Sequence, residues 1–454
     1  MEPILKSVAR EYTKRYGDLK PVCFLFPNKR CSVFFKKYLS ECGVMTEDLP
    51  HILTISEFTS QVARKIEASR IEQLFILYKA YIDIIGDKGE EIEFEVFRGW
   101  GETVLGDFNT VDLYLHDSSE IFKNINDYRS LATDFLTEDQ KEVMKEYFGV
   151  EDFQDSKRFW KQFDDPASTS ELKKKFINLW QILGPLHQKF ISVLSSKGLG
   201  SSGTIFREAA KKIEERGKEI LPYLKIVAVG FNALNEAERI IFRSLQQIGG
   251  NPGYDDFADF IWDAAGYFLN SRDFSASRFV LSNKKRFPSP KWWQEIHASE
   301  IESDFPDFRI ISAPSVTAQA KVAGEILKEY KTKEEKRRVA DAEVALVLPD
   351  ESLLPNLLYS LPETLGDINL TMGYSLKQTS VASFVSLLRR LFMSKREGKS
   401  TISFYSKDLK LFFAHPYAYI LFQVSEIEKL MGHVLQFHKI SVDNKEIENH
   451  IPSF

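Results

Sequence analysis

The sequence contains only three cysteines in 454 residues, Cys23, Cys31 and Cys42. They are too few to hold a chain of this length together through disulfides. Their spacing fits no zinc-binding pattern, because no second pair of cysteines or histidines lies near enough to complete one. We therefore expect a reduced, cytoplasmic protein with no metal and no other cofactor bound to this chain.

Long apolar runs are also missing. The longest lie near Ile226–Val229 and Ala345–Leu348, far short of the ~20 residues that a membrane span needs. The N-terminus from Met1 to Lys6 lacks the apolar stretch of a signal peptide. We expect no membrane partner. The 36 Phe, 17 Tyr and 6 Trp are too much apolar surface to leave in water, so the chain is expected to fold into packed domains.

The residues that ATP hydrolysis requires are absent from the sequence. No G-x-x-x-x-G-K-[ST] loop occurs anywhere, so no lysine of that kind reaches a β- or γ-phosphate. The apolar run Ile226–Val229, which would be the Walker B strand, is followed by Gly230 rather than by an acid. The segment Gly198–Gly203 matches G-x-G-x-x-G, but it follows a helical pattern instead of a strand. We predict that it is a turn between two helices and that the chain does not hydrolyse ATP.

A metal-dependent nuclease site has only weak support. Asp350, combined with Asp408-Leu-Lys410 or with Asp443-Asn-Lys445, can be made to fit the acid, acid-x-lysine pattern of such enzymes. With 28% charged residues, such triplets occur by chance, and Asp408 lies in a helical pattern where the motif requires a strand. The histidines form no nucleophilic set. The sequence therefore leaves open whether the chain belongs to an enzyme.

The first part of the chain has the pattern of an α/β unit. Pro21–Phe26 is expected to be a buried parallel strand, followed by a helix over Cys31–Glu41. Strand-type sequence returns at Lys225–Gly230, before a helix over Glu236–Gln247. The intervening sequence has helical patterns only, with a first helix capped by Ser56 and further helices over Ile71–Ile85, Phe94–Leu115, Thr137–Phe148 and Ser168–Ser195. We predict an α/β lobe, residues 1–53 and 204–300, interrupted by a helical insertion over residues 54–203.

A second α/β set is predicted over residues 301–454. Its strands are expected at Phe308–Ser312, Val344–Leu348 and Ile368–Thr371, with helices over Val316–Tyr330 and Val381–Phe392. Residues 331–338 read as a solvated charge run. The last sixty residues mix helix and loop, with helices over Lys407–Gln423 and Glu426–Phe437, and close no recognisable domain. Residues 283–306 read as a connection between the two lobes.

Two segments have the composition of nucleic-acid contacts. Asn28, Lys29 and Arg30 directly follow the first predicted strand and open a helix, where donors and cations suit a phosphate. The alternative interpretation is an ordinary solvated turn. The segment Lys284–Trp293 combines cations with aromatic rings, as single-strand stacking surfaces do. Here the alternative is a linker that folds onto the body of the protein. The net charge of −5 neither supports nor excludes DNA, because acidic proteins can focus positive charge locally.

Four segments resemble the AddB-like PD-(D/E)XK nuclease family proteins of Bacteroidetes, which are relatives of AddB, RecC and the superfamily 1 helicases. The matching segments span nearly the whole chain in the same order. They are Phe26–Leu39 (PN-R-…-F…-L), Phe97–Leu115 (F..WG..LL.DFN.VD.YL), Val229–Glu238 (VGFNALN..E) and Ile368–Leu376 (N(V/L)TMGYPL, with Ser375 in place of the proline). None of them is an active-site motif.

The resemblance implies an α/β fold of two RecA-like, P-loop NTPase-like lobes with degenerate Walker motifs. The first lobe would hold the helical insertion, and the second would be incomplete. It also implies a helicase-like scaffold that binds DNA in double-strand break repair without hydrolysing ATP. The family's nuclease domain, with its Mg²⁺, would lie beyond residue 454, so the chain is expected to be a fragment or a truncated gene product.

The partners implied by the resemblance are DNA, as single strands or duplex ends, and an AddA/UvrD-like helicase subunit. DNA contacts are expected from the turn Asn28, Lys29 and Arg30 and from a loop with Thr371, Gly373 and Tyr374. The loop offers a hydroxyl, a glycine that permits close approach and a ring for stacking. The alternative function is a protein–protein scaffold that keeps the helicase fold without DNA affinity.

Overall fold

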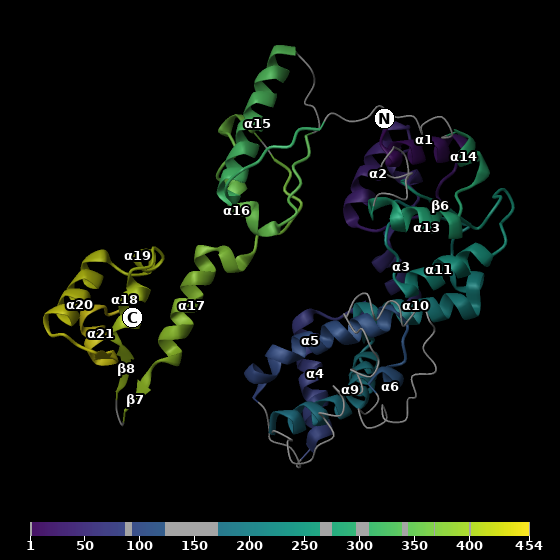
Figure 1. The fold of residues 1–454 in the computed structure, drawn as a ribbon. Coiled ribbons are helices and arrows are strands. Elements are labelled where there is room, and N and C mark those ends of the chain that lie inside the picture. The colour runs from purple at the N-terminus through teal and green to yellow at the C-terminus, as the bar shows by residue number, and fades with distance from the viewer. Residues whose placement is uncertain are drawn as a thin grey trace, which may run out of the picture. The chain divides into compact units, whose positions relative to one another are not determined.

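The computed structural model describes residues 2–86, 93–122, 171–263, 275–296, 308–337, 344–366, 368–398 and 401–453. The chain forms two compact units, Met1–Pro306 and Asp307–Phe454, and each is described here by itself (Figure 1). Within the described residues, no helix combines the length and apolar character required to cross a membrane.

The first unit is built on a parallel sheet with the strand order β2-β1-β5-β6. β1 (Val22–Phe26), β5 (Lys225–Val229) and β6 (Ala258–Ile261) are buried at every position, as strands covered on both faces are. The predicted parallel α/β sheet is thus confirmed at β1 and β5. The sequence analysis missed β6 and β2 (His51–Thr54), which are four residues long and have no continuous apolar pattern.

Helices cover both faces of this sheet. Alternate residues of each strand enter different cores, because side chains point to opposite faces with a period of two. Phe24 and Val227 pack with α1 (Ile4–Tyr16) and α2 (Lys29–Glu41). Leu25 and Ala228 pack on the other face with residues of α3 (Ile55–Ala63), α10 (Ser202–Arg216) and α11 (Glu236–Gln247). The predicted cap Ser56 is wrong, because Thr54 caps α3 through a reciprocal capping box with Glu57.

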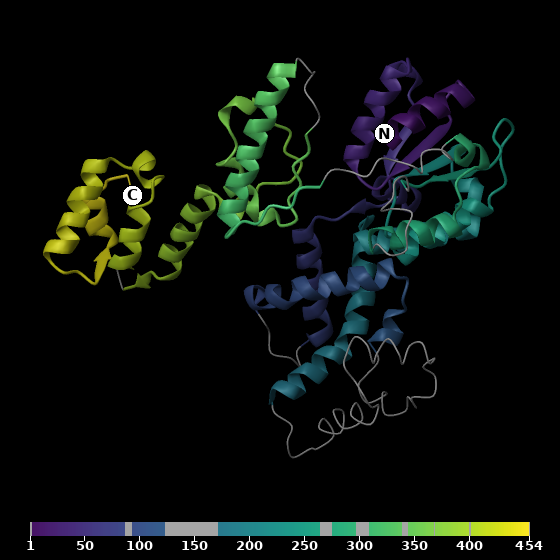
Figure 2. The same ribbon diagram turned by 45° about the horizontal axis from the view of Figure 1, so that its top comes forward.

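A helical group with its own core lies between β2 and β5 in the sequence. It contains α4 (Arg70–Ile85), α5 (Phe94–Leu113), α6 (Ser118–Ile121) and α9 (Glu171–Ser196), which pack around Leu77, Phe97, Phe108, Leu186 and Phe190. Figure 2 shows these helices grouped next to the sheet layer. The helix predicted for Thr137–Phe148 lies outside the described residues.

The segment from Gly198 to Gly203 is the predicted turn between two helices. It follows α9 and holds β4 (Leu199–Gly200), which pairs in parallel with β3 (Ile66–Glu67). Ser201 then caps α10. The G-x-G-x-x-G pattern therefore does not follow a strand of the main sheet, and the prediction of a helix–helix turn is confirmed.

The predicted connection, residues 283–306, is helical and belongs to the first unit up to Ile296. It forms α13 (Arg278–Arg286) and α14 (Lys291–Ile296). Phe287 and Trp293 are buried in the two cores of the sheet. The described part of this segment is therefore folded onto the sheet rather than extended between lobes.

The three strands predicted in the second unit are wrong. Residues 308–312, 344–348 and 368–371 have no strand pairing, and their apolar side chains are exposed, Ile310 to 99% and Val347 to 79%. An apolar run forms a strand only where a neighbouring strand supplies its hydrogen bonds, and these runs pair with none of the described residues. The helix predicted to end at Tyr330 continues to Arg337 as α15 (Val316–Arg337) and includes most of the predicted charge run. α15 packs against α16 (Leu354–Leu358).

The end of the chain forms a small α+β core that the sequence analysis did not anticipate. Here β7 (Arg396–Glu397), β8 (Ile402–Tyr405) and β9 (Ser441–Asp443) form an antiparallel sheet. The helix predicted for Lys407–Gln423 is divided by a turn containing Pro416. The helices of this region are α17 (Ser380–Met393), α18 (Ser406–Phe413), α19 (Ala418–Leu421), α20 (Val424–Gln436) and α21 (Asn444–His450).

Candidate nucleic-acid interface at the sheet edge

The carboxyl edge of the parallel sheet has the topology of a ligand-binding edge. The connection from β1 leads through α2 to β2, on one side of β1. The connection from β5 leads through α11 to β6, on the other side. The strand order therefore reverses between β1 and β5, and in open α/β sheets ligands bind outside the carboxyl ends of the strands at such a switch point. The turns after β1 and β5 flank it.

The turn after β1 holds the predicted residues Asn28, Lys29 and Arg30 together. Asn28 is extended, with φ −152° and ψ 163°, and its Oδ1 accepts a hydrogen bond from the Cys31 amide at 3.2 Å. The side chain thereby caps α2 and satisfies one of the amides that lack an intrahelical partner in the first turn. The cap fixes the direction of α2 and places Lys29 and Arg30 in the first turn of the helix.

The cations of α2 are almost uncompensated. The Lys29 side chain is 84% exposed, and its Nζ lies 3.8 Å from Oε1 of Glu57, a distance and exposure at which an ion pair contributes little. The pKa of Glu57 is lowered, chiefly by the hydrogen bond from the Thr54 amide and less by Lys29 and Lys36. Arg30 is exposed and has no hydrogen-bond or ion-pair partner among the described residues.

Sequence reasoning missed two further cations on the same helix. Lys36 and Lys37 are exposed on α2 and have no hydrogen-bond or ion-pair partner in the described part of the chain. They follow Lys29 by seven and eight residues, which places all three on one side of a helix. That spacing was the signal that could have identified them.

Gly230 follows β5 directly and allows the chain to turn at the carboxyl edge of the sheet. Gly230 has φ +72°, a backbone conformation that favours glycine. The chain then turns back into α11, where Asn235 and Glu238 form a reciprocal capping box. Burial raises the pKa of Glu238. This carboxylate serves the helix cap, and the turn presents main chain rather than an acid at the sheet edge.

The second predicted contact, Thr371, Gly373 and Tyr374, lies in the other unit and is described separately. All three residues are exposed in an irregular segment before α17, and Tyr374 is 42% exposed. A Cβ built on Gly373 meets no atom within 4 Å, and its φ lies outside the left-handed region. Nothing in the described protein therefore requires glycine at this position. The role of the loop in DNA contact stays a prediction.

The three carboxylates considered for a nuclease have structural partners. Asp350 accepts a hydrogen bond from the Ser352 amide at 2.9 Å, and Asp443 caps α21 through the Glu446 amide at 2.8 Å. Asp408 is buried in α18, where it pairs with Arg390 at 2.7 Å. Within the described residues, no group of three or more histidine, cysteine or acidic side chains is arranged to hold a metal ion.

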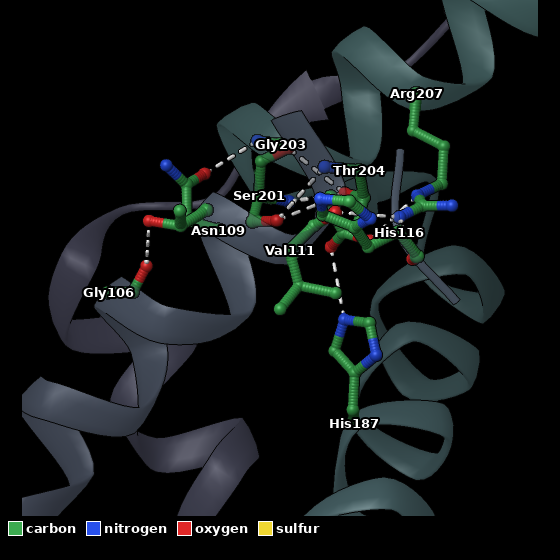
Figure 3. A network of polar contacts seen from close by, with 11 residues as sticks. Gly106, Asn109, Val111, His116, His187, Ser201, Gly203, Thr204 and Arg207 are labelled. Carbon is green, nitrogen blue, oxygen red and sulfur yellow. Dashed lines mark hydrogen bonds and ion pairs between the residues drawn. The ribbon is translucent and has the colours of Figure 1, made fainter. Parts of the chain in front are cut away.

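The segment Phe97–Leu115 contains a polar junction between helices (Figure 3). Oδ1 of Asp112, on α5, accepts a hydrogen bond from Nε of Arg207 on α10 at 2.9 Å. Its Oδ2 lies 3.1 Å from Nε2 of His187 on α9. Asp112 and His187 are both buried. Because buried carboxylates require partners, this one acidic residue links three helices.

Asn109 and Arg207 complete the junction. Oδ1 of Asn109 accepts from the Gly203 amide at 2.6 Å, at the start of α10. Nη2 of Arg207 donates to the carbonyls of Val111 at 2.9 Å and His116 at 2.6 Å. These contacts therefore attach the helical group to α10, whose buried side chains share a core with those of β1 and β5.

No protein-family model matches the chain, and no curated protein matches it.

Proposed function

We propose that this chain is the DNA-binding, helicase-like scaffold region of an AddB-like repair nuclease, with two RecA-like lobes of which the first holds the helical group. The observation that carries the proposal is the carboxyl edge at the β1/β5 switch point. There, a capped helix N-terminus is combined with cations that have almost no internal compensation. A phosphate backbone supplies the missing negative charge.

In this proposal the chain binds DNA but does not drive its movement. The sequence has no P-loop lysine, and Gly230 follows the strand that would end in the Mg²⁺-binding acid. A separate AddA/UvrD-like helicase subunit would supply ATP hydrolysis, in the cytoplasm, during double-strand break repair. Mg²⁺ would belong to a nuclease domain that is not among these residues.

The test is a salt titration of binding to a fluorescent single-stranded oligonucleotide. Replacing Lys29 and Arg30 by glutamine removes two phosphate contacts, so the slope of log K against log salt should fall by about 1.4. The control replaces Lys211 of α10 and Lys218 of the turn that precedes β5, and it should leave the slope unchanged. An unchanged slope in the Lys29 and Arg30 variant would contradict the proposed contact.

The loop in the second unit is tested by stacking. Tyr374→Ala should weaken binding by about 1–3 kcal/mol if a base stacks on the ring. Tyr359 provides a matched control, because it is 90% exposed in the same unit. If both variants bind as the wild type does, the loop makes no stacking contact.

One observation favours the alternative function of a protein–protein scaffold. The second unit exposes many large apolar side chains, among them those of the three segments predicted as strands. Exposed apolar surface of this kind marks protein-interaction sites. A chain that binds no DNA at 50 mM salt but self-associates, or is captured by a helicase subunit, in sedimentation velocity would support this function instead.

A further inference from the structure

The last turn of α13 is fixed at the same sheet edge as Lys29 and Arg30. Nδ2 of Asn283 donates to the carbonyl of Asn232, in the turn after β5, at 2.6 Å. Nε1 of Trp262, the first residue after β6, donates to the carbonyl of Phe287 at 2.7 Å. Asn283, Trp262 and Phe287 are all buried. Two independent hydrogen bonds therefore place the end of α13 over the carboxyl ends of β5 and β6.

The structure separates the aromatic and the basic residues of Lys284–Trp293. Phe287 packs edge-on against Phe242 and also contacts Phe260. Trp293 is buried, and Trp292 packs against Tyr12 of α1. The rings of this segment serve the cores of the sheet, so the segment is not a surface on which bases stack.

The cations of the segment remain on the surface without partners. Lys284, Lys285 and Arg286 are exposed, and none has a hydrogen bond or an ion pair with a described residue. Cations elsewhere in the unit are often paired, as in Lys6–Glu41 at 3.1 Å and Arg15–Asp255 at 2.7 Å. The dipole of α13 favours cations at its C-terminal end, but each such interaction is worth only ~0.3–1 kcal/mol. Three adjacent cations without an ion-pair partner among the described residues are the charge pattern that phosphates complement.

We propose that Lys284, Lys285 and Arg286 form a second phosphate-binding site that contacts the backbone of duplex DNA. The site rests on the proposed function and deepens it. β1 and β6 are separated by β5 alone, so the ends of these strands lie ~10 Å apart. Lys29 and Arg30 lie next to the end of β1, and the last turn of α13 lies next to the ends of β5 and β6. The two groups of cations therefore lie on either side of the switch point.

The duplex is the form of DNA that this second site fits. Within Lys284–Trp293, the second site offers cations without an exposed ring, whereas single-strand sites combine cations with aromatic platforms. The exposed ring of α13, Phe279 at 44%, lies outside this segment, near the start of the helix. Duplex DNA carries one negative charge per ~1.7 Å of its axis and rewards contacts that are made to phosphates alone. Binding at α13 is therefore independent of sequence. A duplex end with a single-stranded tail would contact α13 through its duplex arm.

The experiment compares two variants with equal changes in charge. The first replaces Lys284, Lys285 and Arg286 by glutamine. The control replaces Lys211, Arg216 and Lys218, which include a cation in the last turn of α10. Anisotropy is measured over a salt series with a blunt duplex, a single strand and an acidic polyglutamate peptide, and the melting temperature confirms folding.

The first variant should lower the slope of log K against log salt for the duplex by about 2.7. Between 50 and 200 mM salt, its affinity for the duplex should therefore fall about 40-fold less than that of the wild type. The control variant and the single-strand slope should change little. An unchanged duplex slope in a folded variant overturns the second site. If replacing Lys29 and Arg30 still lowers the single-strand slope, the proposed function survives that result. Stronger binding to polyglutamate than to duplex, lost in the first variant, would overturn the assignment to DNA.

Discussion

Gly203 lies directly against Asn109, where the start of α10 meets α5. Its amide donates to Oδ1 of Asn109 at 2.6 Å, and a Cβ built on it would come within 2.6 Å of the Asn109 carbonyl oxygen. A backbone atom cannot move aside as the end of a flexible side chain can. The glycine is therefore required by the close approach of two helices that join the helical group to the sheet.

Gly203→Ala should destabilise the protein by about 1–3 kcal/mol, because the added methyl group overpacks this contact. Urea unfolding followed by circular dichroism measures the change. Gly99→Ala is the control. Gly99 lies in the middle of α5, and a Cβ there meets no atom within 4 Å, so the change should stabilise the helix by about 0.5–1 kcal/mol. Equal effects of the two substitutions would contradict the contact.

Asp112→Ala should lower the free energy of unfolding far more than the removal of an exposed acid on the same helix. The substitution leaves Arg207 and the buried His187 without their common partner, and we expect a loss of about 3 kcal/mol in the free energy of unfolding. Asp107→Ala removes the same charge from an exposed position of the same helix and should cost no more than about 0.5 kcal/mol. A small effect of Asp112→Ala in urea unfolding would show that the junction does not hold α5, α9 and α10 together.

The sequence predicted the elements whose signal is local. β1 and β5 are continuous apolar runs, and α11 spans the predicted range Glu236–Gln247. β6 was not predicted because it contains Asp259, an acid that is unusual in a buried strand. Its charge is compensated by Lys225 on the neighbouring strand. A single sequence does not reveal a partner that is contributed by tertiary structure.

The same limit explains the wrong strands in the second unit and the cations that were not anticipated at the candidate site. Residues 344–348 have the composition of a strand, but strand formation also needs a neighbour to pair with, and composition does not supply one. Asn28, Lys29 and Arg30 could be proposed because they follow a strand directly. The position of Lys284 to Arg286 could not, because the hydrogen bonds from Asn283 and Trp262 that place them come from the folded structure.

Lys225 and Asp259 form a fully buried ion pair between β5 and β6. Their charged atoms are 3.0 Å apart, and Oδ2 of Asp259 also accepts from the Tyr12 hydroxyl at 2.6 Å. Asp259→Asn should cost about 3–5 kcal/mol, because it leaves the Lys225 charge buried without its counter-charge. Combining Asp259→Asn with Lys225→Met removes the unpaired charge and should recover part of this loss. Chemical denaturation of the single and double variants measures the coupling, and additive losses would contradict it.

Tyr16 makes stability depend on pH in the alkaline range. Burial, and to a lesser extent the charge of Asp259, raises the pKa of Tyr16 to about 12, whereas a tyrosine in an unfolded chain titrates near ~10. The folded state therefore holds the proton more tightly. This stabilisation is complete below pH ~10 and is lost as the pH rises towards 12. Because the ring is only half-buried, we expect its contribution to be about 1 kcal/mol after screening by solvent.

Urea unfolding at pH 9 and pH 11.5 should show a smaller loss of stability for Tyr16→Phe than for the wild type. Tyr374→Phe, an exposed ring in the other unit, should behave as the wild type does, and an equal loss in all three proteins would contradict the role of Tyr16.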